Sequence, residues 1–186
     1  MSRTRAANRI TRRKSAGRLV FVLGGSSSGK SEAAIRLAGH TRPRAFVATG
    51  QELDEEMAAR IAHHRATRPP DWATAEVPIE LAGWFKRQGK SYRTIVVDCV
   101  TLWLSNLHMR NDTHAVITQQ VTELLRAIRT TSARVVIVSN ELGLGLVPVE
   151  RSVRAFRDLA GCVNQQIATE ADEVHFVVSG RLLQLK

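Results

Sequence analysis

A glycine-rich segment between an apolar run and a helical pattern is the feature that most constrains how this chain can fold. The pattern is G-x-x-x-x-G-K-[ST], the phosphate-binding loop, and the residues that match it are Gly24, Gly25, Ser26, Ser27, Ser28, Gly29, Lys30 and Ser31. The apolar residues 19–23 predict a buried strand before the loop, and residues 30–39 predict a helix after it. Backbone N–H groups of such a loop surround phosphate oxygens, and the positive end of the helix faces the same anion. The segment therefore predicts nucleotide binding.

Short apolar runs alternate with helical patterns along the rest of the chain. Strands are predicted at residues 45–49, 94–98, 134–139 and 174–178, with an edge strand at 181–186. Helices are predicted at residues 53–65, 79–88, 115–130 and 153–171, and the Pro-rich stretch 68–71 ends the first of these. This alternation predicts an α/β fold: a single-domain P-loop NTPase with a mostly parallel sheet, helices on both faces and a C-terminal edge strand.

The net charge of +10 is concentrated at the amino terminus. Residues 1–18 hold seven of the 27 Lys and Arg side chains and none of the 17 acids, so the remainder carries a net charge of only +3. We therefore predict a basic, disordered extension over residues 1–17 and one domain over residues 18–186. An RNA contact or a membrane-surface contact of the extension is the alternative interpretation.

No apolar run approaches the ~20 residues of a membrane-spanning helix, and the Arg-rich start lacks the apolar segment of a secretory signal. We expect a cytoplasmic protein with no stable membrane insertion. The two cysteines, Cys99 and Cys162, are far apart and neither lies in a CxxC pair. They indicate neither a disulfide framework nor a zinc site.

Three side chains have the chemistry to handle a nucleoside triphosphate. Lys30 is expected to reach the terminal phosphates, and the Ser31 hydroxyl to hold Mg²⁺. Asp98 ends the apolar run 94–97, where this class of protein places a second carboxylate on the metal side. A strand-end aspartate that caps the next turn is the alternative. With the phosphate loop present, we predict a Mg²⁺ site at Ser31 and Asp98.

A charged helix is less expected in a simple ATPase. Glu56, Arg60 and His64 recur at i, i+4 and i+8 and so share one helical face. Such a face is usually solvated. A neutral imidazole can also act as a nucleophile towards phosphorus and later pass the group on. The residues alone leave both interpretations open.

From residue 19 to residue 186 an ordered set of motifs resembles one enzyme family. The set comprises the phosphate loop, Ala48-Thr49, Asp54–Met57 with Arg60, Ile61 and His64, then Trp72, Thr74 and Glu76, and residues 98–107, 138–148 and 154–161 with Asn164 and Gln165. The chain is similar to the bifunctional adenosylcobinamide kinases and adenosylcobinamide-phosphate guanylyltransferases of the cobalamin pathway. One departure is Ser27, where the family commonly has Arg.

The resemblance implies two reactions and a homotrimer. A nucleoside triphosphate, ATP or GTP, phosphorylates the aminopropanol hydroxyl of adenosylcobinamide. GTP then gives its GMP unit to adenosylcobinamide phosphate and releases pyrophosphate. The resemblance implies that His64, and not its neighbour His63, is the covalent guanylyl carrier. It also adds further residues to the nucleotide site of the phosphate loop: Ala48, Thr49, Gly50, Arg65, Ala66, Thr67, Arg68, Glu76 and Asp98.

Two rival functions use fewer of these features. A P-loop small-molecule kinase without a covalent intermediate needs Lys30, Ser31 and Asp98 but leaves His64 as a surface residue. A nucleic-acid-binding NTPase would use the basic extension, but the domain has neither a basic helix nor the aromatic pattern of an RNA-binding module. We therefore expect no nucleic-acid partner. For Trp72, Trp84 and Trp103 we expect core or interface positions rather than corrinoid stacking.

Overall fold

The computed structural model describes residues 17–186 except 67 and 69. These residues form a seven-stranded sheet in the order β3-β2-β4-β5-β1-β6-β7. Every neighbouring pair is parallel except β6 and β7, which are antiparallel. The strands are β1 (Arg18–Gly24), β2 (Arg44–Ala48), β3 (Ala73–Glu76), β4 (Thr94–Asp98), β5 (Arg134–Asn140), β6 (Glu173–Val178) and β7 (Arg181–Gln184).

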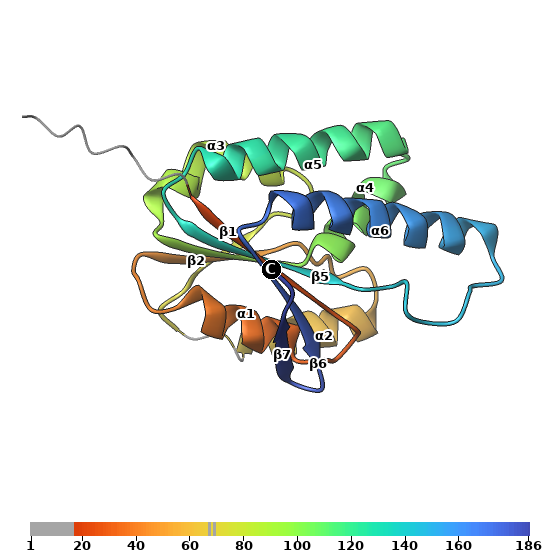
Figure 1. Ribbon diagram of the computed structural model, residues 1–186, viewed down its shortest axis with the longest axis horizontal. Coiled ribbons are helices and arrows are strands. Elements are labelled where there is room, and N and C mark those ends of the chain that lie inside the picture. Colours follow the sequence, from red (N-terminus) through yellow and green to blue (C-terminus); the bar gives the residue numbers. More distant parts are fainter. Residues whose placement is uncertain (1–16, 67, 69) are drawn as a thin grey trace, which may run out of the picture.

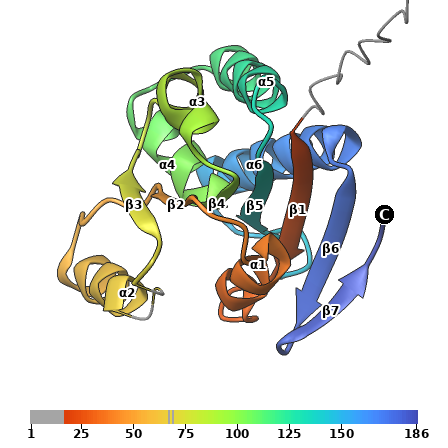
Figure 2. The same cartoon turned by 90° about the vertical axis from the view of Figure 1, so that its left-hand side faces the viewer.

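Helices lie on both faces of the sheet. They are α1 (Lys30–Ala38), α2 (Glu55–Ala66), α3 (Leu81–Gln88), α4 (Val100–Met109), α5 (His114–Arg129) and α6 (Arg151–Glu170), with a short 3₁₀ turn at Gly89–Ser91. Figures 1 and 2 show α3, α4, α5 and α6 on one face, and α1 and α2 on the other. None of the described helices is both long enough and apolar enough to cross a membrane.

Strand β1 shows why both faces are covered. Leu19, Phe21 and Leu23 alternate with Val20 and Val22 and pack into two different core clusters. The first cluster includes buried side chains of α3 to α6, and the second includes alanines of α1. A run that is apolar at every position can be buried only in a sheet sandwiched between two layers. Each fully buried side chain of this kind contributes about 1.5–3 kcal/mol relative to exposure.

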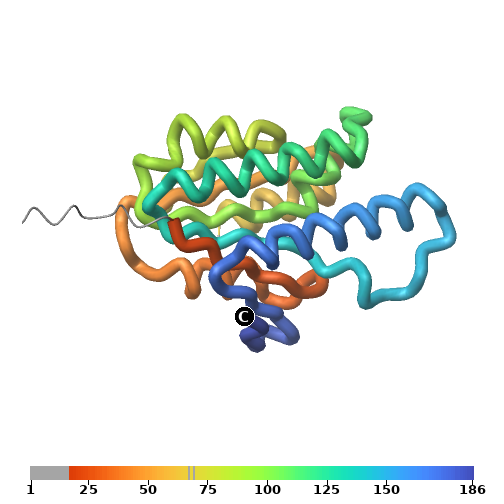
Figure 3. Tube along the Cα trace, turned by 45° about the horizontal axis from the view of Figure 1, so that its top comes forward, coloured from red at the N-terminus to blue at the C-terminus, as the bar shows by residue number. Residues whose placement is uncertain are grey.

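The strand order places three chain segments together at one edge. Because β5 lies between β1 and β4, its carboxyl end lies between the phosphate loop and Asp98. In the ladders, Gly24 is opposite Asn140, and Asp98 is opposite Val138. The segment after β5, residues 141–150, projects beyond this edge before α6 returns (Figures 1 and 3). This carboxyl edge is where open parallel sheets bind ligands.

The predicted α/β fold with a C-terminal edge strand is confirmed, and the structure shows that this strand, β7, is antiparallel to β6. Each predicted strand and helix is present, with ends shifted by at most a few residues. Two elements were not predicted, the short strand β3 and the helix α4. Trp72, Trp84 and Trp103 are all buried, as expected for core positions.

Candidate active site

The phosphate loop connects β1 to α1 with two residues in the left-handed region. Gly29 has φ 89° and Ser27 has φ 54°. Gly29 tolerates this conformation because it has no Cβ. The loop places the first turn of α1 at the carboxyl edge, where unpaired N–H groups can hold an anion.

Lys30 is buried at the start of α1, with a relative exposure of 8%. Its ammonium group donates a hydrogen bond to the Gly25 carbonyl within the same loop. Burial lowers the pKa of Lys30, and the neighbouring Cys99 and Asp98 act in the opposite direction. An anionic phosphate at this position would replace the lost hydration of the ammonium group and favour its charged form.

The tip of the β6–β7 hairpin contacts the phosphate loop. The Gly180 N–H donates to the Ser28 carbonyl over 2.9 Å. A Cβ built on Gly29 would lie 3.3 Å from the Gly180 Cα, so the two glycines permit this close approach. Figure 2 shows the hairpin at the edge of the sheet. The sequence indicated a turn at Gly180 but not its contact with the phosphate loop.

Asp98 is half-buried at the end of β4, and the residue after it is held by Thr49. The fully buried Thr49 hydroxyl donates to the Cys99 carbonyl over 2.7 Å and accepts from the Cys99 N–H over 2.9 Å. The Thr49 N–H donates to the Asp98 carbonyl over 3.1 Å. Thr49 thus positions Asp98, while its predicted contact with the nucleotide stays a prediction. Burial, reinforced by the charge of Asp98, raises the pKa of the Cys99 thiol to about 12, so this thiol is not a nucleophile at neutral pH.

Ser31 and Asp98 fit the demands of Mg²⁺. Both supply hard oxygen donors, from α1 and from the end of β4, and these two elements pack against each other. Among the described residues there is no group of three or more His, Cys, Asp or Glu side chains that would form a complete metal cage. Mg²⁺ in nucleotide sites uses few protein ligands and takes the others from phosphates and water. The donor set therefore matches a nucleotide-dependent Mg²⁺ site.

Asn106 of α4 fixes the end of β2. Its side-chain amide donates to the Thr49 carbonyl over 2.8 Å and to the Pro78 carbonyl over 2.9 Å. The residue is 4% exposed, so both bonds are shielded from water. The sequence placed Asn106 in a motif but gave no signal of this function, because a buried bridging amide looks like any polar helix residue.

Helix α2 carries the two histidines and buries none of its residues. Arg60 and Glu56 form the predicted i, i+4 pair, with Nε 3.7 Å from Oε1. The rings of His63 and His64 are neighbours, with centroids 6.2 Å apart. Beside them, Arg65 pairs with the Glu76 carboxylate at the end of β3. This ion pair ties the last turn of α2 to the carboxyl edge.

Arg68 is a half-buried cation that follows the end of α2. Its guanidinium lies 4.2 Å from the centre of the Phe46 ring. Its Nε and Nη1 atoms are buried and make no hydrogen bond among the described residues. Burial lowers the pKa of Arg68, and Asp98 and Glu76 partly oppose this effect. An anion beside Arg68 would supply the acceptors that the guanidinium lacks.

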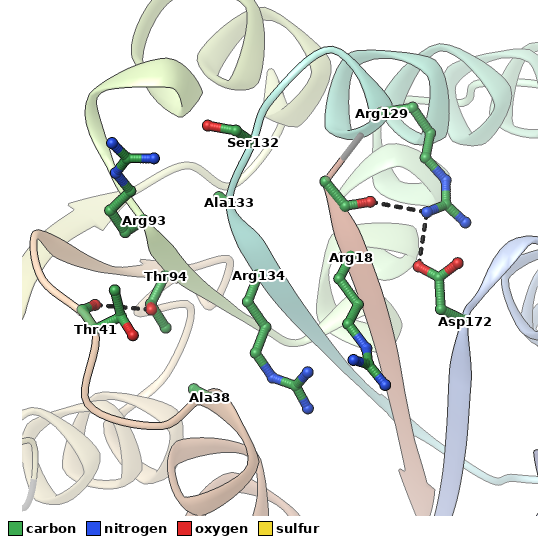
Figure 4. Close-up of a pocket in the computed structure, with 11 residues that line it drawn as sticks. Arg18, Ala38, Thr41, Arg93, Thr94, Arg129, Ser132, Ala133, Arg134 and Asp172 are labelled. Atoms are coloured by element: carbon green, nitrogen blue, oxygen red, sulfur yellow. Dashed lines mark hydrogen bonds and ion pairs between the residues drawn. The ribbon is translucent and has the colours of Figure 1, made fainter. Parts of the chain in front are cut away.

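A large cavity at the opposite edge of the sheet is distinct from this site. It has a volume of about 690 Å³ and lies at the amino ends of β1, β4 and β5 (Figure 4). Three of the four arginines that line it form ion pairs: Arg129 with Asp172 at 2.7 Å, and Arg18 and Arg134 with Glu173 at 2.7 and 3.0 Å. These pairs hold β6 to the neighbouring elements. We therefore assign this cavity a structural function.

The predicted nucleotide-site residues gather along the carboxyl edge. The phosphate loop, Ala48, Thr49, Gly50 and Asp98 lie at or after the ends of β1, β2 and β4. Arg65, Ala66, Arg68 and Glu76 lie at the ends of α2 and β3. Thr67 lies outside the described residues, as do residues 1–16 of the predicted extension. The predicted roles of these residues stay predictions, as does the homotrimer.

The sequence matches a known family over nearly all of its length. The family described as cobinamide kinase / cobinamide phosphate guanyltransferase matches residues 20–185. The bifunctional adenosylcobalamin biosynthesis protein CobP of Pseudomonas aeruginosa is 40% identical over 167 residues, which are 89% of this chain and 96% of that protein. The bifunctional adenosylcobalamin biosynthesis protein CobU of Escherichia coli K12 is 39% identical over 180 residues, which are 90% of this chain and 99% of that protein.

Among solved structures, a KaiC-like protein, PH0186, from Pyrococcus horikoshii OT3 aligns with a TM-score of 0.48 and 12% identity. The alignment covers 87% of this chain and 71% of that chain.

Proposed function

The chain belongs to the cobinamide kinase / cobinamide phosphate guanyltransferase family, and from that premise we propose which of its residues carry each reaction. It is a bifunctional enzyme of adenosylcobalamin biosynthesis that acts as a cobinamide kinase and as a cobinamide-phosphate guanylyltransferase. We propose that both reactions use the nucleotide site at the carboxyl edge. The observation that carries this proposal is that the phosphate loop, with the buried Lys30, and Asp98 lie at the same carboxyl edge of the sheet, at the ends of β1 and β4 on either side of β5.

In the kinase step the phosphate loop holds the nucleoside triphosphate. Loop N–H groups and Lys30 bind the terminal phosphates, and Ser31 and Asp98 hold Mg²⁺. Mg²⁺ held by these residues would neutralise part of the phosphate charge during transfer to the acceptor hydroxyl. Ser27 leaves this loop without the arginine common in the family, so Lys30 is its one cationic side chain.

In the guanylyl step His64 acts as the carrier. An imidazole nitrogen of His64 attacks the α-phosphorus of GTP, the phosphorus–nitrogen bond forms, and pyrophosphate leaves with its charge stabilised by Lys30. The phosphate of adenosylcobinamide phosphate then attacks the same phosphorus and frees the histidine. Splitting the transfer lets the bulky acceptor bind after pyrophosphate has left. Support for this role comes from the Arg65–Glu76 pair, which ties the helix end that carries His64 to the site.

Recognition of guanine is assigned to Glu76. A carboxylate accepts hydrogen bonds from the N1–H and N2–H edge of guanine, an edge that adenine does not offer. Glu76 is exposed at the end of β3, and Arg65 holds its carboxylate. The phosphoryl donor in the kinase step is ATP or GTP.

The test is covalent labelling of the purified enzyme with Mg²⁺ and GTP labelled at the α- or at the γ-phosphate. We expect retained α-label that is acid-labile and alkali-stable, as a phosphoramidate is, and no retained γ-label. His64→Ala abolishes the label, whereas His63→Ala, the matched control on the same helical turn, keeps it. If His64→Ala retains as much α-label as wild type, the carrier assignment is wrong. If wild type itself retains no label, the covalent route fails.

A further inference from the structure

A second cavity opens at the carboxyl edge, on the face of the sheet covered by α6. It has a volume of about 530 Å³, within the usual range of ligand pockets. Leu23 at the end of β1 and Glu141 after β5 line it on one side. Arg157, Asn164 and Gln165 of α6 line it on the other. None of these residues has a function in the nucleotide site described above.

Glu141 places a carboxylate between this cavity and the phosphate loop. Its backbone N–H donates to the carbonyl of Gly24, the first loop residue, over 3.0 Å. One carboxylate oxygen accepts the Gly143 N–H over 2.6 Å. The other carboxylate oxygen makes no hydrogen bond within the part of the chain that the structure describes. Glu141 is thus a half-buried acceptor whose backbone is bonded to the phosphate loop.

Asn164 is a polar residue of α6 that lines the cavity. Its side-chain NH₂ donates to the Asn140 carbonyl over 3.0 Å, which sets the orientation of the amide. The residue is 5% exposed, and its Oδ1 atom is buried without any donor among the described residues. A buried amide oxygen rarely lacks a donor in a folded protein.

We propose that this cavity binds the aminopropanol arm of cobinamide and that Glu141 is the general base of the kinase step. The assignment rests on the proposed use of the phosphate loop in that step. The arm matches the lining: its hydroxyl is the phosphoryl acceptor, and its secondary amide suits a wall that carries the polar side chains of Asn164 and Gln165. The macrocycle is too large for the cavity and stays outside its opening.

The chemical step balances without another reactant. The hydroxyl oxygen forms a bond to the γ-phosphorus while its proton passes to Glu141. The bond between the γ-phosphorus and the β,γ-bridging oxygen breaks, and the nucleoside diphosphate leaves. Glu141 then returns the proton to solvent. In the guanylyl step the nucleophile is a phosphate that is already ionised, so no base is needed.

Because only the kinase step needs a base, GMP transfer by the same protein serves as the control. The two measurements are single-turnover phosphorylation of adenosylcobinamide from γ-labelled nucleoside triphosphate, and GMP transfer to ready-made adenosylcobinamide phosphate. Both are run with saturating substrates. For Glu141→Gln we expect the first rate to fall at least ~100-fold, the usual contribution of a general base, and the second to stay within about threefold.

Two further variants make the result decisive. Glu150→Gln removes a carboxylate from the far end of the same 141–150 segment and should leave both rates near wild type. Asp158→Asn removes the other carboxylate that lines the cavity. The proposal is overturned if Glu141→Gln keeps its kinase rate within about threefold, if both rates fall together, or if Asp158→Asn alone shows the selective loss. Loss of GMP transfer by wild type would instead contradict the proposed guanylyl function.

Discussion

Replacing Thr49 by valine tests how the fold positions Asp98. The two side chains have nearly the same shape, so the change removes the hydroxyl and its two hydrogen bonds to Cys99 from a fully buried position. The Cys99 carbonyl still accepts the Trp103 N–H over 3.2 Å, whereas the Cys99 N–H is left without an acceptor among the described residues. One lost hydrogen bond costs about 1 kcal/mol, and one orphaned buried donor costs about 1–3 kcal/mol. The expected loss in the free energy of unfolding is therefore about 2–4 kcal/mol.

Urea unfolding of wild type, Thr49→Val and Thr49→Ser at one protein concentration measures this loss. With a slope of ~2 kcal/mol per molar urea, the midpoint of Thr49→Val should fall by about 1–2 M at unchanged slope. Thr49→Ser keeps the hydroxyl and loses only a methyl group, so its loss should be about 1 kcal/mol. Because Thr49 orients the peptide after Asp98, Thr49→Val should also raise the Mg²⁺ concentration needed for half-maximal kinase activity. A midpoint shift below about 0.3 M, or equal losses in both variants, would refute this reasoning.

Two further predictions concern charged groups at opposite edges of the sheet. Burial alone would raise the pKa of Asp172, but hydrogen bonds from Arg129 and from the Leu19 N–H, with the charges of Arg129 and Arg18, lower it below the ordinary value of 3.8. This carboxylate therefore stabilises the fold at neutral pH and loses that effect as the pH falls through its folded pKa. Asp172→Asn should lower the melting temperature at pH 7, and the melting temperature of the variant should decrease less than that of wild type between pH 7 and pH 3. An unchanged melting curve at both pH values would contradict this. Arg68→Met should weaken GTP binding by about tenfold or more, because a charged donor to the anion is lost. It should not destabilise the fold, since the two buried nitrogen atoms that make no hydrogen bond are removed as well. Calorimetric titration and thermal unfolding measure the two effects, and unchanged affinity would contradict the assignment.

The sheet could be predicted from the sequence because its strands carry their signal locally. Strands β1, β4 and β5 are runs of Val, Ile, Leu and Phe bounded by turn or helix signals. Strand β3 has no such signal, since it reads Ala-Thr-Ala-Glu and is largely exposed. Its four residues form a strand because they pair with β2.

Helix α4 was not predicted because its residues are apolar around most of the helix. Six of its ten residues are buried, among them Trp103 and Asn106. A segment that is apolar on nearly all sides lacks the 3.6-residue alternation that identifies a surface helix. Only the packing of α4 between β5 and the rest of the core determines that it is a helix.

The residues of the candidate site also differ in whether a local sequence signal identifies them. The phosphate loop could be predicted because its function lies in consecutive residues, and the family motifs indicated Asp98 and His64. The contacts that hold the site in place could not be predicted, because each joins segments that are distant in the sequence: Asn106 with Pro78, Asn164 with Asn140, and Gly180 with Ser28. No local pattern distinguishes a bridging asparagine from an exposed one.

The position of β5 explains how one small domain accommodates two reactions. Helices α1 and α2, with the phosphate loop and the proposed carrier His64, lie on one face of the sheet, and α6 with the proposed acceptor cavity lies on the other (Figure 1). The carboxyl end of β5 lies between them, and Glu141 follows it directly. In the proposed arrangement, a nucleotide held at this edge would present its phosphates to the acceptor from one side and to the histidine from the other. Since the two partners approach from opposite faces, the same phosphate loop can serve both transfers without the acceptor and the carrier competing for space.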